Sequence, residues 1–185
     1  MSQRAPARAG RPRAGFAAVV TTRSAEQTQA LGATLGALAR PGDRIALLGD
    51  LGAGKTQLAK GFATGLGVTE VVNSPSFTLM AEYEGRLPLF HIDLYRLDGA
   101  VSALSGGLLD ERQATGVTLS EWAERLGDAL DRDRLEVRFA ITGDEERAIE
   151  LRAASPRYLR YVRAAAEWTD TAGEGAGADP GRVDA

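Results

Sequence analysis

The chain has 185 residues, of which 44% are hydrophobic, and a formal net charge of −3. This length and apolar content suit one domain with its own core, whereas the lack of cysteine and the single histidine exclude disulfides and metal sites built from cysteine or several histidines. The acidic balance argues against general coating of nucleic acid, and because no apolar run of about 18 residues occurs, we expect a cytoplasmic protein without a membrane partner.

Both ends of the chain are predicted to be disordered tails around one domain of residues 16–166. Residues 1–15 are rich in Ala, Pro and Gly and contain arginine without any acidic residue, whereas the charged residues within 167–185 are all acidic except Arg182. The two tails are therefore expected to carry charge of opposite sign.

The first elements of the predicted domain are a strand and a helix. An apolar, β-branched run over residues 16–22 predicts the strand. Ser24 followed by Gln27 resembles a capping box, so the helix is expected to begin there and to end before Pro41. Its apolar face is predicted to contain Leu31, Leu35 and Leu38.

Further alternation of strand and helix follows. A nearly continuous apolar run over residues 43–50 predicts a buried central strand, and a helix is expected from Lys55 to Gly67. Two more strands are predicted on either side of a turn at residues 84–86, one over Phe77–Tyr83 and one within residues 87–97.

The last part of the domain is predicted to be antiparallel. Residues 98–116 are weakly helical and interrupted by glycine, and a short strand is expected over residues 117–122. Two alternating runs within residues 135–153 predict a hairpin about the turn at Gly143 and Asp144. A final helix is expected after Pro156, with one face made of Leu159, Val162 and Ala166. Together these elements predict an α/β fold with a mixed sheet and an antiparallel hairpin near the C-terminal end.

The stretch GDLGAGKT, from Gly49 to Thr56, matches the phosphate-binding pattern G-x4-G-K-[ST]. An apolar strand precedes it and a helix follows, so we expect a P-loop NTPase-like three-layer sandwich. The glycines allow the amides of the loop to point toward phosphate oxygens. Among 22 basic side chains only two are lysine, and Lys55 is expected to reach the β- and γ-phosphates, where the planar fork of arginine fits poorly.

The loop also predicts individual contacts. The hydroxyl of Thr56 is expected to bind Mg²⁺. Lys60, one turn further along the helix, is expected to be a solvated surface charge. The residues predicted to contact the nucleotide here are Gly49, Asp50, Leu51, Gly52, Ala53, Gly54, Lys55, Thr56 and Gln57.

Two acidic residues end predicted strands, which is where α/β sheets place their ligands. Asp93 closes one apolar run and Glu121 closes another. Either carboxylate could hold Mg²⁺, directly or through water, while the other polarises an attacking water. Ser74 and Ser76 flank a proline after the P-loop helix, a place where many NTPases sense the γ-phosphate. His91 is more often a structural residue in such a position than a catalytic one.

Four motifs taken together, GDLGAGKT, NSPSFTL, HIDLYRL and SEWAERL, resemble the bacterial ATPases of tRNA threonylcarbamoyladenosine biosynthesis, the TsaE type. The resemblance covers about residues 19–153. It implies an ATP- and Mg²⁺-dependent enzyme that supports threonylcarbamoylation of adenosine 37 in tRNAs reading ANN codons. It also implies a partner, a TsaB–TsaD transferase complex, through which tRNA would be reached.

The resemblance assigns roles by position. Thr56 and Glu121 would contact Mg²⁺, and Asp93 would support the metal and hydrolysis, so that the catalytic residues are Lys55, Asp93 and Glu121. Residues 74–76 would form the γ-phosphate switch. Further residues placed near the nucleotide are Thr28, Trp122 and Arg147.

Two positions differ from the family pattern. The switch usually reads Ser-Pro-Thr, whereas Ser76 stands here in place of threonine, and the commonly acidic segment after Leu97 has only Asp98.

Two other functions compete with the one that the family implies. A small-molecule P-loop kinase would need a lid, for which residues 109–116 supply only Arg112. A non-catalytic, nucleotide-dependent binding switch is the other alternative, while a GTPase is disfavoured because no N-K-x-D motif occurs.

Overall fold

The computed structural model describes residues 16–96 and 111–169. Its elements are β1 (Ala17–Thr22), α1 (Ala25–Ala37), β2 (Asp43–Leu48), α2 (Lys55–Gly65), β3 (Met80–Tyr83), β4 (Leu89–Asp93), the 3-10 helix η1 (Glu111–Ala114), β5 (Val117–Glu121), the 3-10 segment η2 (Ala123–Ala129), β6 (Leu135–Ile141), β7 (Arg147–Ala153), η3 (Pro156–Tyr158) and α4 (Leu159–Glu167). Most of the weakly helical segment and of both predicted tails lies outside the described residues.

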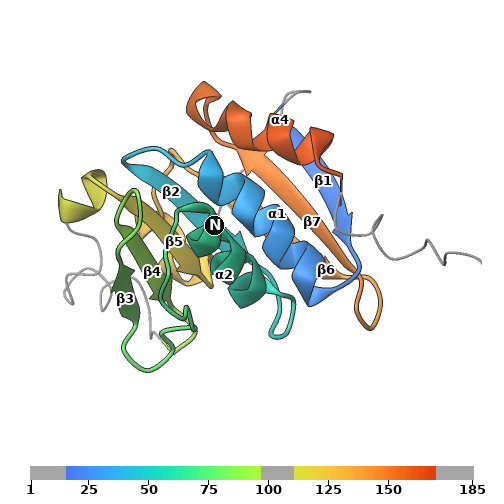
Figure 1. Cartoon of the computed structure of the whole chain (residues 1–185), viewed down its shortest axis with the longest axis horizontal. Helices are drawn as coiled ribbons and strands as arrows, with labels where there is room; N and C mark the ends of the chain where they lie inside the picture. Colours follow the sequence, from blue (N-terminus) through green and yellow to red (C-terminus); the bar gives the residue numbers. More distant parts are fainter. Residues whose placement is uncertain (1–15, 97–110, 170–185) are drawn as a thin grey trace, which may run out of the picture.

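The described strands form one mixed sheet in the order β1-β7-β6-β2-β5-β4-β3 (Figure 1). Its centre is parallel, because β2 pairs in parallel with both β5 and β6, and β5 pairs in parallel with β4. Its margins are antiparallel through the β6–β7 hairpin, β1 and β3. The predicted α/β fold with a mixed sheet and a late antiparallel hairpin is confirmed.

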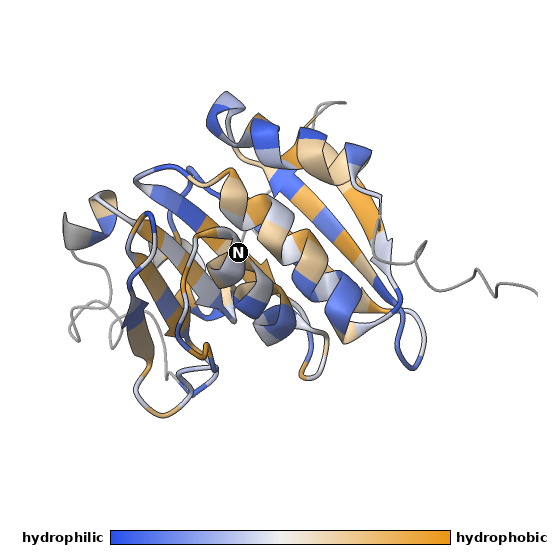
Figure 2. Cartoon of the chain, viewed as in Figure 1, coloured by the Kyte–Doolittle hydropathy of each residue, from blue (hydrophilic) through white to orange (hydrophobic). Residues whose placement is uncertain are grey.

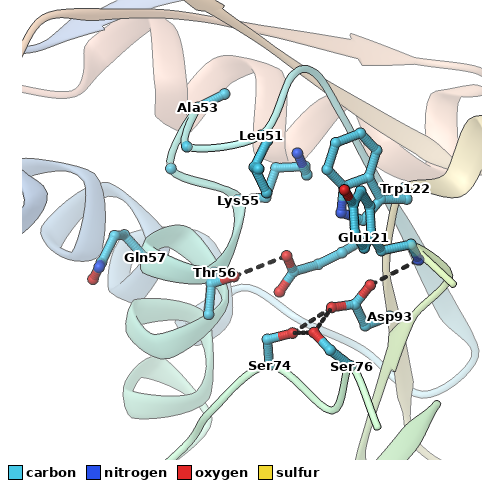
Figure 3. Close-up of a pocket in the computed structure, with 13 residues that line it drawn as sticks. Leu51, Ala53, Lys55, Thr56, Gln57, Ser74, Ser76, Asp93, Glu121 and Trp122 are labelled. Carbon is cyan, nitrogen blue, oxygen red and sulfur yellow. Dashed lines mark hydrogen bonds between the residues drawn. The ribbon is translucent and has the colours of Figure 1, made fainter. Parts of the chain in front are cut away.

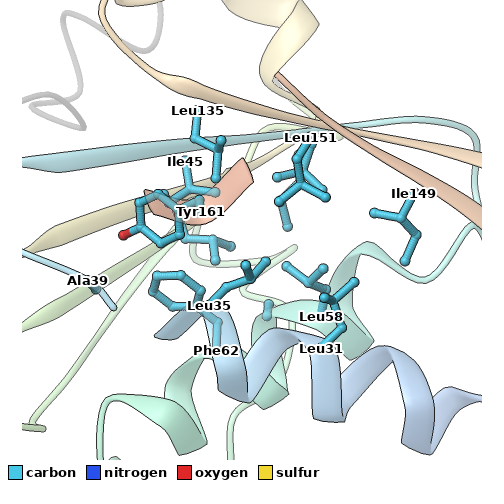
Figure 4. Close-up of a cluster of buried hydrophobic side chains, with 14 of the residues drawn as sticks. Leu31, Leu35, Ala39, Ile45, Leu58, Phe62, Leu135, Ile149, Leu151 and Tyr161 are labelled. Carbon is cyan, nitrogen blue, oxygen red and sulfur yellow. The ribbon is translucent and has the colours of Figure 1, made fainter. Parts of the chain in front are cut away.

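Helical segments cover both faces of the sheet and make three layers. In the described part of the chain, the α-helices α1, α2 and α4 lie on one face (Figure 1), where their leucine and aromatic side chains share one core with β2, β5, β6 and β7 (Figure 4). On the other face, Ala46 and Leu48 of β2 pack against Ala123 of η2 and Leu130, which follows it. The alternation of hydrophilic and hydrophobic residues along β7, visible in Figure 2, agrees with a strand covered by helices on one face.

Helices α1 and α2 pack against each other almost backbone to backbone. A methyl group added to Gly61 of α2 would lie 1.9 Å from the carbonyl oxygen of Gln29, and one added to Gly36 of α1 would lie 2.1 Å from that of Phe62. The side-chain amide of Gln29 also donates to Oε1 of Gln57 at 2.7 Å. This close packing sets the first turn of α1 beside the start of α2, and therefore beside the P-loop.

The predicted beginning of α1 is confirmed. The side chain of Ser24 accepts a hydrogen bond from the amide of Gln27 at 3.1 Å, and Oε1 of Gln27 accepts from the amide of Arg23 at 2.6 Å. The first of these bonds satisfies a donor that the first turn of a helix leaves without an intrahelical partner, and the second joins the helix to the residue before its cap. Leu31 and Leu35 are fully buried, as predicted.

The strand predicted from Phe77 begins three residues later, at Met80. The carbonyl of Pro75 accepts hydrogen bonds from the amides of Thr78 and Leu79, and Leu79 has a φ of 64°. This turn occupies the residues that hydrophobicity alone assigned to the strand. It leaves Phe77 84% exposed.

The buried face of α4 also differs from the prediction. Val162 is buried as expected, but Leu159 is only half-buried and Ala166 is exposed. The face that packs on the sheet consists of Tyr158, Tyr161, Val162 and Ala165. The tyrosines can be buried because the hydroxyl of Tyr158 donates to the carbonyl of Asp133 at 3.1 Å and that of Tyr161 to Oδ2 of Asp43 at 2.7 Å.

Strand register aligns the predicted acidic residues with the P-loop. Leu47, just before the loop, pairs with Glu121 in β5, and Glu121 pairs with Asp93 in β4. The carboxyl ends of three adjacent parallel strands therefore meet at one edge of the sheet, where α/β proteins bind ligands.

Candidate functional site

The loop between β2 and α2 has the backbone conformation that its glycines predict. Gly49, Gly52 and Gly54 have φ values of 140°, 76° and 103°, a region that side chains strongly disfavour. Gly49 has a second constraint, because a methyl group there would lie 2.8 Å from the carbonyl oxygen of Phe139. The loop turns in the manner expected of a phosphate-binding loop and leads directly into the first turn of α2.

Lys55 points back into this loop. Its ammonium group donates to the carbonyl oxygens of Gly49 at 2.6 Å and Asp50 at 2.8 Å, and it lies 3.7 Å from the centre of the Trp122 ring (Figure 3). The residue is only 4% exposed. Burial lowers the pKa of Lys55, while nearby carboxylates, Glu121 foremost, partly oppose that effect.

Thr56 and Glu121 are joined across the site. The hydroxyl of Thr56 donates to Oε2 of Glu121 at 2.9 Å, and the other carboxylate oxygen, Oε1, lies 2.9 Å from Nε2 of His91. Glu121 and His91 are 2% and 0% exposed. The carboxylate is thus held at both oxygens, one by the helix that follows the P-loop and one by the neighbouring strand.

Asp93 makes a second carboxylate cluster, with the two serines that flank Pro75. Ser74 and Ser76 both donate to Oδ2 of Asp93, the latter at 2.6 Å, and the amide of Tyr95 donates to Oδ1 at 2.9 Å (Figure 3). Burial alone would raise the pKa of Asp93, but these hydrogen bonds outweigh it and lower the pKa below its ordinary value. The predicted switch segment and the strand-end acid are therefore one connected unit.

Aromatic rings cover the site beside the lysine. Trp122 follows Glu121 directly and has a φ of 58°, unusual for a residue with a side chain. Its ring is tilted against that of Tyr95, with 4.9 Å between the ring centres. The indole face toward the Lys55 ammonium is a favourable arrangement for a cation.

These groups enclose one cavity of about 370 Å³, a size suited to a small ligand. The phosphate-binding loop forms one wall, and the two carboxylates with the switch serines form the other (Figure 3). The lining residues are Leu51, Gly52, Ala53, Gly54, Lys55, Thr56, Gln57, Ser74, Ser76, Asp93, Tyr95, Glu121 and Trp122.

Thr28 and Arg147 lie on the opposite side of the P-loop. They line a second cavity of about 360 Å³, which Gly52, Gly54 and Gln57 share with the first. Arg147 reaches the carbonyl of Gly52 at 3.4 Å. The hydroxyl of Thr28 lies 2.8 Å from that of Thr22 inside the protein, so Thr28 contributes its surface to the cavity while its oxygen is already hydrogen-bonded.

The donor set suits a hard cation shared with a ligand. A threonine hydroxyl and carboxylate oxygens are the ligands that Mg²⁺ prefers, usually completed by water and substrate phosphates. In the described parts of the chain, no cluster of three His, Asp or Glu side chains forms a metal cage by itself. The site therefore fits a magnesium ion that arrives with a nucleotide better than one held by protein alone.

Sequence reasoning found most of this site and missed one of its members. Residues 51–57 of the loop, both strand-end acids and both switch serines line the first cavity, whereas Gly49 and Asp50 do not. The hydrogen bond of His91 to Glu121 agrees with the interpretation of His91 as a hydrogen-bonded structural residue on the strand face of Asp93, although the sequence did not indicate its partner. Tyr95, which follows Asp93 by two residues, was not singled out.

Comparison with known proteins identifies related chains. The family model described as "Threonylcarbamoyl adenosine biosynthesis protein TsaE" matches residues 22–149. The chain is 46% identical over 134 residues to the tRNA threonylcarbamoyladenosine biosynthesis protein TsaE of Bacillus subtilis, covering 72% of this chain and 84% of the relative. It is 39% identical over 128 residues to the protein of the same name from Treponema pallidum, covering 69% and 95%.

A solved structure is similar as well. The crystal structure of Bacillus subtilis YdiB matches with a TM-score of 0.68 and 38% sequence identity, over 82% of this chain and 95% of the other. Among the described residues, none of the helices combines the length and the apolar character needed to cross a membrane.

Proposed function

The chain belongs to the TsaE family of P-loop nucleotide-binding proteins, and from this premise we propose that it hydrolyses ATP with Mg²⁺ to support N6-threonylcarbamoylation of adenosine 37 in tRNAs reading ANN codons. The names of its relatives refer to the biosynthesis of threonylcarbamoyladenosine in tRNA. The hydrolytic step, the metal and the partner belong to the proposal.

One observation carries the proposal: a P-loop lysine and two strand-end carboxylates face one another across a single cavity. A nucleotide-binding loop alone would account for Lys55. The cluster of Glu121 with Thr56, and that of Asp93 with the switch serines, add groups that binding alone does not need. Phosphoryl transfer needs such groups, because its catalysis rests on positioning and on charge stabilisation.

Each residue then has a defined task. The loop amides and Lys55 would bind the phosphates, and Thr56 with Glu121 would hold Mg²⁺, with Asp93 in support. The metal would neutralise charge on the phosphate oxygens. The depressed pKa of Asp93 keeps its carboxylate ionised near neutral pH, so it can accept a hydrogen bond from a water molecule and orient it. Ser74 and Ser76 would respond to the terminal phosphate.

The described part of the segment considered as a kinase lid lies away from the phosphate-binding loop. The segment considered as a lid includes η1, which immediately precedes β5. Val117 at the start of β5 pairs with Asp43 at the start of β2, whereas the P-loop follows the other end of β2. The backbone of η1 therefore lies toward the amino ends of the strands, away from the phosphate-binding loop.

The Glu121→Gln variant distinguishes an ATP-hydrolysing enzyme from a non-catalytic binding switch. We expect this variant to bind ATP without Mg²⁺ within a few-fold of the parent, because the P-loop is intact, and to release phosphate in the presence of Mg²⁺ roughly 100-fold more slowly, because the metal loses a charged ligand. Phosphate release and calorimetric ATP affinity are measured on the full chain. Undiminished hydrolysis in the variant would reject the catalytic assignment, and a parent without Mg²⁺-dependent hydrolysis would leave a binding switch.

The pathway and partner are tested in two further measurements. Cells depleted of their own TsaE protein should regain threonylcarbamoyladenosine in tRNA, measured by mass spectrometry of nucleosides, with the parent chain but not with Glu121→Gln. The purified chain should also associate with a TsaB–TsaD transferase complex, tested with and without ATP. Failure of the parent to restore the modified nucleoside contradicts the proposed role.

A further inference from the structure

The histidine of β4 is a buried polar group that the proposed chemistry has not yet used. His91 is 0% exposed, and among the described residues the one side-chain hydrogen bond of its ring joins Nε2 to Oε1 of Glu121 at 2.9 Å. Its other ring nitrogen, Nδ1, is buried and has no hydrogen-bond partner in the described part of the chain. A histidine kept only for packing is expected to have its buried ring nitrogens satisfied.

The direction of this hydrogen bond follows from its partner. A carboxylate oxygen can only accept, so Nε2 carries the proton and donates it to Oε1. With Oε1 held by the strand, Oε2 is the oxygen that faces Thr56. The ring therefore determines which oxygen of Glu121 is presented to the P-loop helix.

We propose that His91 is a positioning residue, which holds the Glu121 carboxylate so that one oxygen stays on Thr56 and remains available to the magnesium ion of a bound nucleotide. The inference rests on the proposed function and deepens it. His91 itself does not contact the cavity, whose lining includes Glu121 but not the histidine. Its effect would pass entirely through the orientation of one carboxylate.

The hydrogen bond from His91 limits where the Glu121 carboxylate can go. Glu121 is the carboxylate that acts most strongly on Lys55, yet the ammonium of Lys55 is hydrogen-bonded to Gly49 and Asp50 rather than to it. Release of Oε1 would free Glu121 to leave its place beside Thr56. The consequence would be loss of the metal ligand, while the loop and Lys55 would still bind the phosphates.

Two amide substitutions of His91 supply the same kind of hydrogen-bond donor at different distances from the main chain. The amide nitrogen of glutamine is as many bonds from Cβ as Nε2 of histidine, whereas that of asparagine is one bond shorter and corresponds to Nδ1. His91→Gln can therefore keep the donor to Glu121, and His91→Asn cannot. His91→Leu removes the donor altogether, and Ile92→Val, which trims the opposite face of the same strand, controls for damage to β4.

The experiment measures calorimetric ATP affinity with and without Mg²⁺, together with the Mg²⁺ dependence of phosphate release, on full-length variants. Removal of a group that orients a metal ligand typically costs 10- to 100-fold in metal affinity or activity. We expect His91→Asn and His91→Leu to lose about 10-fold or more of the affinity that Mg²⁺ adds to ATP binding, and to need correspondingly more Mg²⁺ for half-maximal hydrolysis. Their affinity for ATP without metal should stay within about two-fold, and His91→Gln and Ile92→Val should resemble the parent.

Each of the following outcomes would overturn either the role of His91 or the function on which it rests. Equal behaviour of the glutamine and asparagine variants, or a leucine variant with the parent's Mg²⁺ dependence, overturns the proposal. A loss of ATP affinity without metal in the asparagine variant would show a general structural role and overturns it too. A parent that shows no effect of Mg²⁺ on ATP binding or hydrolysis would instead reject the proposed function, before the role of His91 is reached.

Discussion

Asp93 shows two opposed effects on one carboxyl group. Burial disfavours its charged form, and hydrogen bonds from Ser74, Ser76 and the amide of Tyr95 favour it, with a net lowering of its pKa from the ordinary value. The serines thus do more than line the cavity. They favour the ionised form of an acid whose pKa burial alone would raise.

Loss of these hydroxyls should move the acid limb of the activity profile. In a double variant, Ser74→Ala with Ser76→Ala, burial remains while two favourable hydrogen bonds disappear, so the pKa of Asp93 rises. Hydrolysis that needs the carboxylate then fails at a higher pH as the solution is acidified. The dependence of kcat on pH measures this, with Thr64→Ala on the exposed side of α2 as the matched hydroxyl control. An unmoved acid limb would show that Asp93 is not the titrating group.

At the same scale, the sequence predicted the residues whose neighbours are close along the chain. The P-loop glycines and Lys55 follow from an eight-residue pattern, and the serines follow from their place after a helix. The partition of Asp93 and Glu121 between two clusters could not be predicted, because it depends on side chains from α2 and from residues 74–76 that meet only in the folded chain. The contact between His91 and Glu121 crosses two strands 30 residues apart and needs their register.

At the scale of elements, the α1–α2 pair determines where the P-loop helix lies. Because Gly61 has no side chain, the carbonyl of Gln29 can lie against it. Gly65 makes room for the carbonyl of Ala33 in the same way, since a methyl group added to Gly65 would lie 2.1 Å from that carbonyl oxygen. Helix propensity alone would favour alanine at these positions, by about 1 kcal/mol for each glycine. The glycines are explained by interhelical distance rather than by the helix itself.

Gly61→Ala tests this explanation through the sign of its effect. Propensity predicts a gain in the free energy of unfolding of up to about 1 kcal/mol, whereas overpacking against backbone predicts a loss of about 1–3 kcal/mol or more. We expect the loss, together with weaker ATP binding as α2 shifts. Urea unfolding measures the first and calorimetry the second. A stabilised Gly61→Ala would contradict the account.

Element prediction succeeded where periodicity was strong and local. The central strand, both long helices of the first half and the hairpin lie where they were predicted. The early start assigned to the strand at Phe77 was wrong, because the turn at Pro75 is set by backbone hydrogen bonds and by the contact of its serines with Asp93. The predicted buried face of α4 was wrong because a tyrosine is expected at the surface unless its hydroxyl has a hydrogen-bond partner, and the partners are known only from the folded structure.

At the scale of the whole molecule, α4 and the residues just before it bind the C-terminal end of the described chain to the start of the central strand, β2. Asp43 is fully buried and accepts from the side chains of Arg157, Arg160 and Tyr161 and from the amide of Arg40. A buried carboxylate is tolerated only with such partners. The domain bounds of 16–166 stay a prediction, and Trp168 just beyond them packs on the same core.

This arrangement predicts instability at alkaline pH. Burial first, and then the charge of Asp43, raise the pKa of Tyr161 far above 10, and burial raises that of Tyr158. Above pH 10 the unfolded chain releases protons that the folded chain retains, so the free energy of unfolding falls as pH rises, by about 1.4 kcal/mol per pH unit for each such group. Urea unfolding between pH 9 and 11 should show the fall, and Tyr161→Phe should reduce its slope. An equal slope in the variant would contradict the coupling.

The central claim is that the loop and its lysine bind the phosphates of ATP with magnesium. The chain contains two lysines, Lys55 in the loop and Lys60 further along the same helix, so Lys60→Ala is a matched control. Calorimetric affinity for ATP with Mg²⁺ is the measurement. The account predicts a loss of roughly 100-fold for Lys55→Ala, since charge-assisted hydrogen bonds disappear, and a change within about two-fold for Lys60→Ala. Equal affinity of Lys55→Ala and the parent would contradict it.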